Sequence, residues 1–127
     1  PVWVGYSCRG NGKGEPVSWT IESLSIEDMV RQISPARGDV AGVMHTSVSL
    51  VSASIKAVRK LHPGPIAVYP DTGHFEMPSW VWTDAIAPVD FGEMAVGWVE
   101  EGAQILGGCC GTGVEHIEAL VEALARR

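Results

Sequence analysis

The sequence predicts an α/β fold built of four consecutive β-α units with parallel strands. Short apolar runs rich in β-forming residues alternate with segments whose apolar residues recur at helical spacing. The runs are apolar at successive positions, which is typical of parallel strands in a sheet that helices cover. A chain of 127 residues has room for one such domain, and we expect residues 1–127 to form it.

The first unit begins with an apolar run at residues 1–7, which predicts a strand. The glycine-rich stretch 9–15 predicts a loop. Residues 25–28 (Ser-Ile-Glu-Asp) match a capping box, in which the serine oxygen accepts a backbone N–H in the first turn of a helix. These residues therefore predict the start of a helix, which Pro35 and Gly38 end.

The second unit consists of a predicted strand over residues 40–44 and a helix that Thr46 or Ser47 can cap. The segment 62–65 (His-Pro-Gly-Pro) ends this helix, because proline cannot continue it. The apolar residues of the helix share one face: Val48, Val51, Ile55, Val58 and Leu61. That face is expected to pack on the sheet.

The last two units follow the same pattern, with predicted strands at residues 66–69 and 103–106. A long loop at 70–89 precedes a helix that ends at Gly102, and a glycine-rich loop at 107–113 precedes the last helix. The third helix has an apolar side made of Phe91, Met94, Ala95, Trp98 and Val99. The last helix has an expected buried stripe of Val114, Ile117, Leu120, Val121 and Leu124.

The charge balance excludes some classes of protein. Nine Lys and Arg residues against fifteen Asp and Glu residues give a net charge of −6, so we expect no nucleic-acid partner. No apolar run approaches the ~20 residues of a membrane span, and no basic-then-apolar signal segment opens the chain. We therefore expect a cytoplasmic protein without a membrane partner.

The polar residues with chemical potential fall directly after the predicted strands: Cys8, His45, Tyr69, Asp71, Cys109 and Cys110. In a parallel α/β fold the carboxyl ends of the strands meet at one edge, where ligand sites are built. The sequence therefore predicts a site at this edge.

The adjacent thiols of Cys109 and Cys110 in the glycine-rich loop indicate a soft metal, with zinc as the default. Two other interpretations remain open. Free cysteines are often small buried hydrophobic residues, and a glycine-rich loop before a helix can hold a phosphate. The three cysteines of the chain are an odd number and form no spread-out disulfide framework.

Residues 107–112 (Gly-Gly-Cys-Cys-Gly-Thr), followed by 115–117 (Glu-His-Ile), resemble the zinc signature at the end of the homocysteine S-methyltransferase family. Residues 68–73 resemble the family's Tyr-Pro-Asn-Ser-Gly segment, and 42–47 resemble its Gly-Val-Asn-Cys-Thr-Ser segment. Residues 1–7 resemble the preceding strand. The resemblance implies the second half of a (β/α)8 TIM barrel.

Carried over position by position, the resemblance implies a zinc site held by Cys109, Cys110 and His45, which stands where the family has its third cysteine. Cys8 is an alternative third thiolate or a packing residue. Cys8, Tyr69 and Asp71 are the candidate residues of the substrate pocket, where Asp71 replaces the family's asparagine. We expect His62 and His116 to be solvated, and His74 to be a loop residue.

The function that the resemblance implies is zinc-dependent transfer of a methyl group to homocysteine, which gives methionine. Its partners would be homocysteine and a methyl donor. Two alternatives remain open, namely a metal-binding half-barrel without methyltransferase activity and a phosphate-binding protein. Because half a barrel leaves two sheet edges exposed, we expect either a homodimer or a chain that lacks the first half of the barrel.

Overall fold

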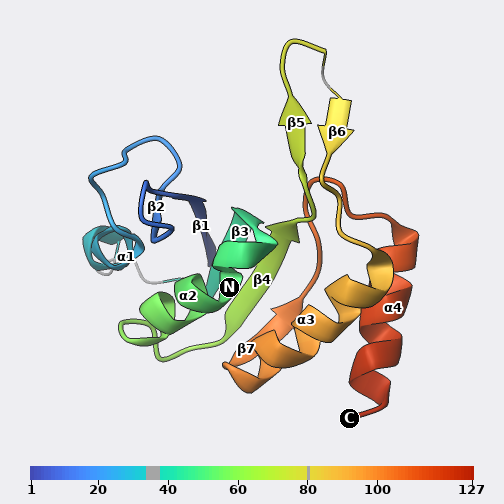
Figure 1. Ribbon diagram of the computed structural model, residues 1–127. Coiled ribbons are helices and arrows are strands. Elements are labelled where there is room, and N and C mark those ends of the chain that lie inside the picture. The colour runs from blue at the N-terminus through green and yellow to red at the C-terminus, as the bar shows by residue number, and fades with distance from the viewer. Residues whose placement is uncertain (34–37, 80) are drawn as a thin grey trace.

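The computed structural model describes residues 1–33, 38–79 and 81–127, and its main sheet has the strand order β2-β1-β3-β4-β7 (Figure 1). Strands β1, β3, β4 and β7 pair in parallel, and β2 pairs antiparallel with the end of β1. The strand bounds are Trp3–Gly10 (β1), Pro16–Ser18 (β2), Val40–Ser47 (β3), Ile66–Asp71 (β4) and Ala103–Leu106 (β7). Strands that follow one another along the chain and pair in parallel are typical of a partial TIM-barrel-like sheet, and the sheet is not closed.

Helices α1 to α4 form a layer in the order of the chain, with each helix packed on the next. Their bounds are Ile26–Ile33 (α1), Val48–Arg59 (α2), Pro88–Glu100 (α3) and Val114–Ala125 (α4). The core lies between these helices and one face of the sheet, and it includes Val43, Val68 and Phe91, all fully buried. The opposite face presents Trp3 and Met44, which are 53% and 38% exposed.

The four predicted strands and four predicted helices are confirmed. Two small features were missed. The expected loop at 9–15 is shorter, because β1 continues to Gly10 and β2 turns back on it. The expected loop at 70–89 contains the hairpin of β5 (His74–Glu76) and β6 (Val81–Thr83). Strands of three residues are too short to show the alternation by which a strand is recognised in sequence.

The capping box at the start of α1 is confirmed, because the Ser25 hydroxyl oxygen accepts the Asp28 backbone N–H at 3.1 Å. The proposed stop at Pro35 lies outside the described residues. At the start of α2 the expected side-chain cap is wrong: Ser47 makes no capping hydrogen bond, and Thr46 belongs to β3. The Thr46 hydroxyl instead accepts the backbone N–H of Cys8 at 3.0 Å, which ties β3 to β1.

The apolar face of α2 is confirmed, since Val51, Ile55 and Val58 are fully buried. The expected stripe of α4 is partly wrong, because Val114 and Val121 are 73% and 58% exposed. The buried residues of α4 are His116, Leu120 and Ala123, which lie on a neighbouring row. Helical spacing fits both rows, and the packing of α4 against α3 decides which one is buried.

None of the helices among the described residues combines the length and the apolar character needed to cross a membrane. The hairpin β5–β6 projects beyond the carboxyl ends of β3 and β4 (Figure 1). The carboxyl edge of the sheet is therefore bordered by this hairpin on one side and by the turn after β2 on the other.

Candidate metal centre

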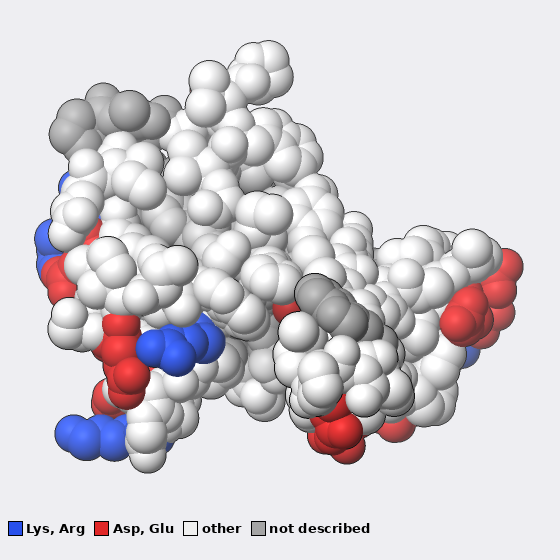
Figure 2. Space-filling view, turned by 90° about the horizontal axis from the view of Figure 1, so that it is seen from above, with Lys and Arg blue, Asp and Glu red and all other residues white. Residues whose placement is uncertain are grey.

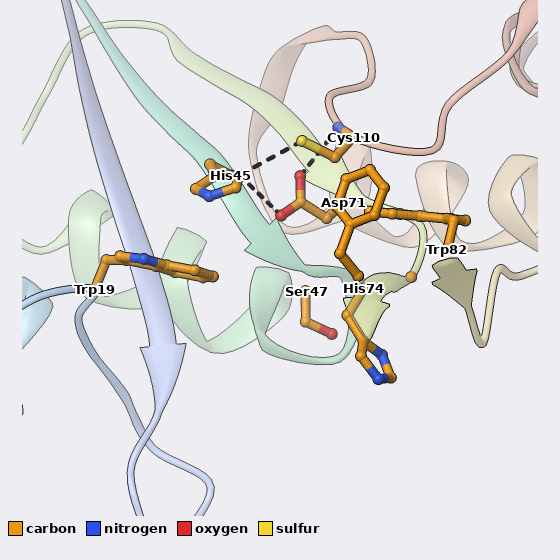
Figure 3. Close-up of a pocket in the computed structure, with 9 residues that line it drawn as sticks. Trp19, His45, Ser47, Asp71, His74, Trp82 and Cys110 are labelled. Atoms are coloured by element: carbon orange, nitrogen blue, oxygen red, sulfur yellow. Dashed lines mark hydrogen bonds and ion pairs between the residues drawn. The ribbon is translucent and has the colours of Figure 1, made fainter. Parts of the chain in front are cut away.

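Four side chains with metal-binding atoms meet at the carboxyl edge of the sheet: His45, Asp71, Cys109 and Cys110. One ligand atom from each lies within 4.8 Å of those of the others. His45 comes from β3, Asp71 ends β4, and the two cysteines follow β7. Figure 3 shows His45, Asp71 and Cys110 pointing toward one another. Segments far apart in the chain thus converge because parallel strands end at the same edge.

The backbone at His45 has a left-handed conformation, with φ at 47°. The register between β3 and β4 shifts between Met44 and Ser47, so a bulge interrupts the regular alternation of β3. Thr46 is fully buried, whereas the His45 side chain is 39% exposed and faces the site. A left-handed backbone is unfavourable for a residue with a side chain, so the irregularity stores strain at the residue that offers the candidate nitrogen donor.

Asp71 is buried and connects His45 with the cysteine loop. Its Oδ2 atom lies 3.0 Å from Nδ1 of His45. Its Oδ1 atom accepts the backbone N–H of Cys110 at 3.1 Å. The carboxylate therefore holds the ring of His45 and the backbone of Cys110 in one arrangement.

The loop that carries Cys109 and Cys110 is fastened to the strands by its backbone. The N–H of Cys109 donates to the Pro70 carbonyl at 3.0 Å, and the Cys110 carbonyl accepts the Thr72 N–H at 3.1 Å. Gly111 takes a left-handed conformation with φ at 76°, and a Cβ there would meet the ring of Trp82. The two Sγ atoms lie 3.9 Å apart, and Sγ of Cys110 is 3.8 Å from Nδ1 of His45.

The electrostatics of the cluster favour a bound cation. Burial, followed by the negative charge of Asp71 and the neighbouring Cys109 thiol, raises the pKa of Cys110 to about 11. At neutral pH the Cys110 thiol thus keeps its proton and is a poor nucleophile on its own. A divalent cation would relieve this repulsion and stabilise the thiolate.

A cavity of about 360 Å³ opens directly beside these residues. His45, Asp71 and Cys110 form part of its lining, and aromatic rings form its sides (Figure 3). Trp19 packs on the ring of His45 with centroids 4.5 Å apart, and Phe75 meets Trp82 edge to face at 4.6 Å. Neither Lys nor Arg lines the cavity among the described residues.

The view onto the carboxyl edge agrees with this lining, because its charged side chains gather mainly at the rim (Figure 2). Sequence reasoning missed Trp19 and Phe75, since their place in the cavity depends on the β2 turn and on the β5–β6 hairpin. Short antiparallel pairs leave no periodic signal that could have placed these rings.

Cys8 and Tyr69 lie outside the cluster. Cys8 is fully buried in the core, and burial raises its pKa to about 11 despite hydrogen bonds with Ser54 and Thr46. The ring of Tyr69 packs against Gly107, where a Cβ would lie 2.7 Å from the ring. Of the candidate pocket residues, the structure places only Asp71 against the cavity.

The expectation that His62 and His116 are solvated is wrong, because they are only 7% and 6% exposed. A polar residue at a helix stop or in a first helical turn is exposed unless another element covers it. Here α4 turns His116 toward α3, where its ring meets Phe91 edge to face at 5.7 Å.

Comparison with known proteins identifies the family of this chain. The model of the family described as homocysteine S-methyltransferase matches residues 1–124. Homocysteine S-methyltransferase 4 of Zea mays is 28% identical over 98% of this chain, which spans 36% of that protein. Homocysteine S-methyltransferase YbgG of Bacillus subtilis (strain 168) is 28% identical over 94% of the chain, again spanning 36% of the relative. Homocysteine S-methyltransferase 1 of Zea mays is 32% identical over the whole chain and 39% of its own length. The chain therefore belongs to the homocysteine S-methyltransferase family.

Proposed function

We propose that this chain is the zinc-binding part of a homocysteine S-methyltransferase and that its metal centre activates a thiol for methylation. The observation that carries the proposal is the convergence of two thiols, an imidazole and a carboxylate within 4.8 Å at the mouth of a cavity. Family membership supports it, since the relatives are named for the transfer of a methyl group to homocysteine sulfur.

The donor set fits zinc. Zinc prefers four ligands drawn from cysteine sulfur, histidine nitrogen and carboxylate oxygen, and this cluster offers one atom of each kind plus a second sulfur. Cys109, Cys110 and His45 would hold the ion, and its fourth position would stay open for a substrate thiol. Asp71 would support these ligands through its contacts with His45 and the Cys110 backbone.

Zinc in this site would supply a Lewis acid that keeps a substrate thiol deprotonated at neutral pH. The chain's own residues do the rest. Asp71 orients His45 and the Cys110 backbone, while the rings of Trp19 and Trp82 border the cavity where a thiol would approach. Because these walls are largely apolar, they would exclude water from the reacting sulfur.

The proposed reaction is the methylation of homocysteine to methionine, with a methyl donor as the second substrate. The chain spans little more than a third of the length of its relatives, 36% of the maize and Bacillus proteins named above. A metal-binding half-barrel without methyltransferase activity is the second candidate, and its response to homocysteine separates it from the first.

The phosphate-binding alternative receives no support from the cysteine loop. Three of its N–H groups already have acceptors within the protein. Cys109 donates to Pro70, Cys110 to Asp71 and Gly113 to His116. A phosphate cradle needs such groups to point outward toward the ligand.

The decisive experiment measures zinc in protein purified under reducing conditions without chelator. We expect about one zinc per chain, and we expect it to be lost in the Cys109→Ser/Cys110→Ser variant. Cys8→Ala is the matched control, because Cys8 is buried outside the cluster and its loss should leave the zinc content unchanged. Zinc-free protein under these conditions would contradict the proposal.

A second step separates the two functions. Cobalt(II) replaces zinc, and its absorption spectrum reports on the ligands of the metal. Addition of homocysteine should change the spectrum, whereas methionine, which has no free thiol, should not. A protein that binds cobalt but gives no response to homocysteine would be the metal-binding half-barrel.

A further inference from the structure

His116 is a buried imidazole that the proposed chemistry does not use. It lies in the first turn of α4 and is 6% exposed. Its Nδ1 atom accepts the backbone N–H of Gly113 at 3.1 Å, and its Nε2 atom lies 3.1 Å from the Ile86 carbonyl oxygen. A carbonyl can only accept, so Nε2 is the donor to Ile86 and Nδ1 is the acceptor from Gly113.

These two contacts close a ring of hydrogen bonds around the cysteine loop. The Ile86 N–H donates to the Thr72 carbonyl at 2.9 Å, and the Thr72 N–H donates to the Cys110 carbonyl at 3.1 Å. Gly113, at the other end of the ring, follows Cys110 by three residues in the chain. The His116 side chain joins the loop after the cysteines to the segment before α3, and the Thr72 hydroxyl adds a hydrogen bond to the Cys110 carbonyl at 3.4 Å.

The loop needs such a fastening because glycine dominates it. Residues 107–113 contain four glycines, and Gly111 has a left-handed backbone. Glycine loses more conformational freedom on ordering than any other residue. A loop of this composition would otherwise present its two thiols in many arrangements, whereas metal ligands must be held within fractions of an ångström of one geometry.

We propose that His116 is a positioning residue for the metal centre. By binding Gly113 and Ile86 at once, it holds the loop so that both cysteine Sγ atoms face His45 and Asp71. The proposal rests on the proposed metal site. It differs from a simple helix-capping role, which would contribute to stability and leave the metal affinity unchanged.

The test compares three variants in the chain as it stands. His116→Leu removes both hydrogen bonds, while His116→Gln keeps one acceptor and one donor on the same side chain. Leu120→Ala is the control, because Leu120 is buried on the same face of α4 and lies outside the hydrogen-bonded ring. Three quantities are measured for each variant. They are the zinc affinity by competition with a chelator, the cobalt(II) absorption spectrum at saturation, and the melting temperature of the metal-free protein.

We expect His116→Leu to bind zinc about tenfold more weakly and to alter the cobalt spectrum, as is usual for partners outside the direct ligands. His116→Gln should recover most of the affinity. Leu120→Ala should lower the melting temperature and leave affinity and spectrum unchanged. If His116→Leu does not fold, His116→Asn replaces it, since asparagine is too short to reach both partners.

Two results would overturn the proposal, and they are distinct. If His116→Leu binds zinc as tightly as the parent, or if Leu120→Ala loses affinity in parallel with stability, His116 is a structural cap only. If the parent chain binds neither zinc nor cobalt, the proposed metal centre fails and the positioning role fails with it.

Discussion

Replacing Asp71 by asparagine or by alanine tests how the cluster is assembled. The carboxylate accepts the Cys110 N–H at 3.1 Å in a partly buried setting and lies 3.0 Å from Nδ1 of His45, whose side chain is 39% exposed. Asparagine keeps the shape and one acceptor oxygen but removes the charge. Alanine removes the acceptor as well.

The magnitudes follow from these contacts. In Asp71→Ala the Cys110 N–H loses its partner, which costs about 1–3 kcal/mol, and the exposed contact with His45 adds less than about 1 kcal/mol. We expect a loss of about 2 kcal/mol, or a fall of roughly 6–10 °C in melting temperature for a domain of this size. Asp71→Asn should lose less than about 1 kcal/mol, because its amide oxygen still accepts the Cys110 N–H.

Metal binding and thiol chemistry should respond to Asp71→Asn in opposite directions. Zinc affinity should fall at least about tenfold, because the carboxylate that orients the His45 ring and the Cys110 backbone loses its charge. The Cys110 thiol of the metal-free protein should react faster with a thiol reagent at pH 8. The reason is that the charge of Asp71 raises the pKa of Cys110, although burial is the larger cause and persists.

The assays are chelator competition, differential scanning fluorimetry and thiol-modification kinetics. Asp84→Asn is the matched control, because the Asp84 carboxylate is 81% exposed and interacts with His74 outside the cluster. It should change none of the three readouts. An Asp71→Asn variant that binds zinc as tightly as the parent, with unchanged thiol reactivity, would refute the role assigned to Asp71.

Three further predictions concern other parts of the chain. His45→Asn should weaken zinc binding at least about tenfold with little loss of stability, because asparagine tolerates the left-handed backbone. His45→Ala should lower the free energy of unfolding by about 1 kcal/mol more. Equal zinc affinity in the parent and His45→Asn would argue against a nitrogen ligand. Burial raises the pKa of Cys8 from 9 to about 11, so its contribution to stability is complete below pH 9 and lost by pH 11. The free energy of unfolding, measured by urea titration, should fall between pH 9 and pH 11 by about 2–3 kcal/mol less in Cys8→Ala than in the parent. The chain should self-associate through the open sheet face, where Trp3 is exposed, and sedimentation should detect this association. Trp3→Glu should abolish the association. A parent chain that stays monomeric at working concentration would contradict this prediction.

Helices and strands with a clear pattern of apolar residues could be predicted from the sequence. The strand at residues 66–69 and the buried face of α2 were predicted correctly because each contains enough consecutive or periodic apolar residues to be recognised. The cysteine pair was singled out by its residue types and its glycine-rich setting. Because parallel strands share one carboxyl edge, the sequence also indicated that His45 and the cysteine pair would lie at the same edge.

Which of these residues come into contact depends on the tertiary structure. Cys8 and His45 both lie near the ends of neighbouring strands, but the side chain of Cys8 faces the core, whereas the bulge in β3 turns His45 toward Asp71. Trp19 reaches the cavity through the antiparallel turn at β2, and His116 is buried because α4 packs against α3. The spacing of apolar residues along a chain indicates whether a segment is a helix or a strand. The direction of a single side chain depends also on backbone irregularities and on partners distant in sequence.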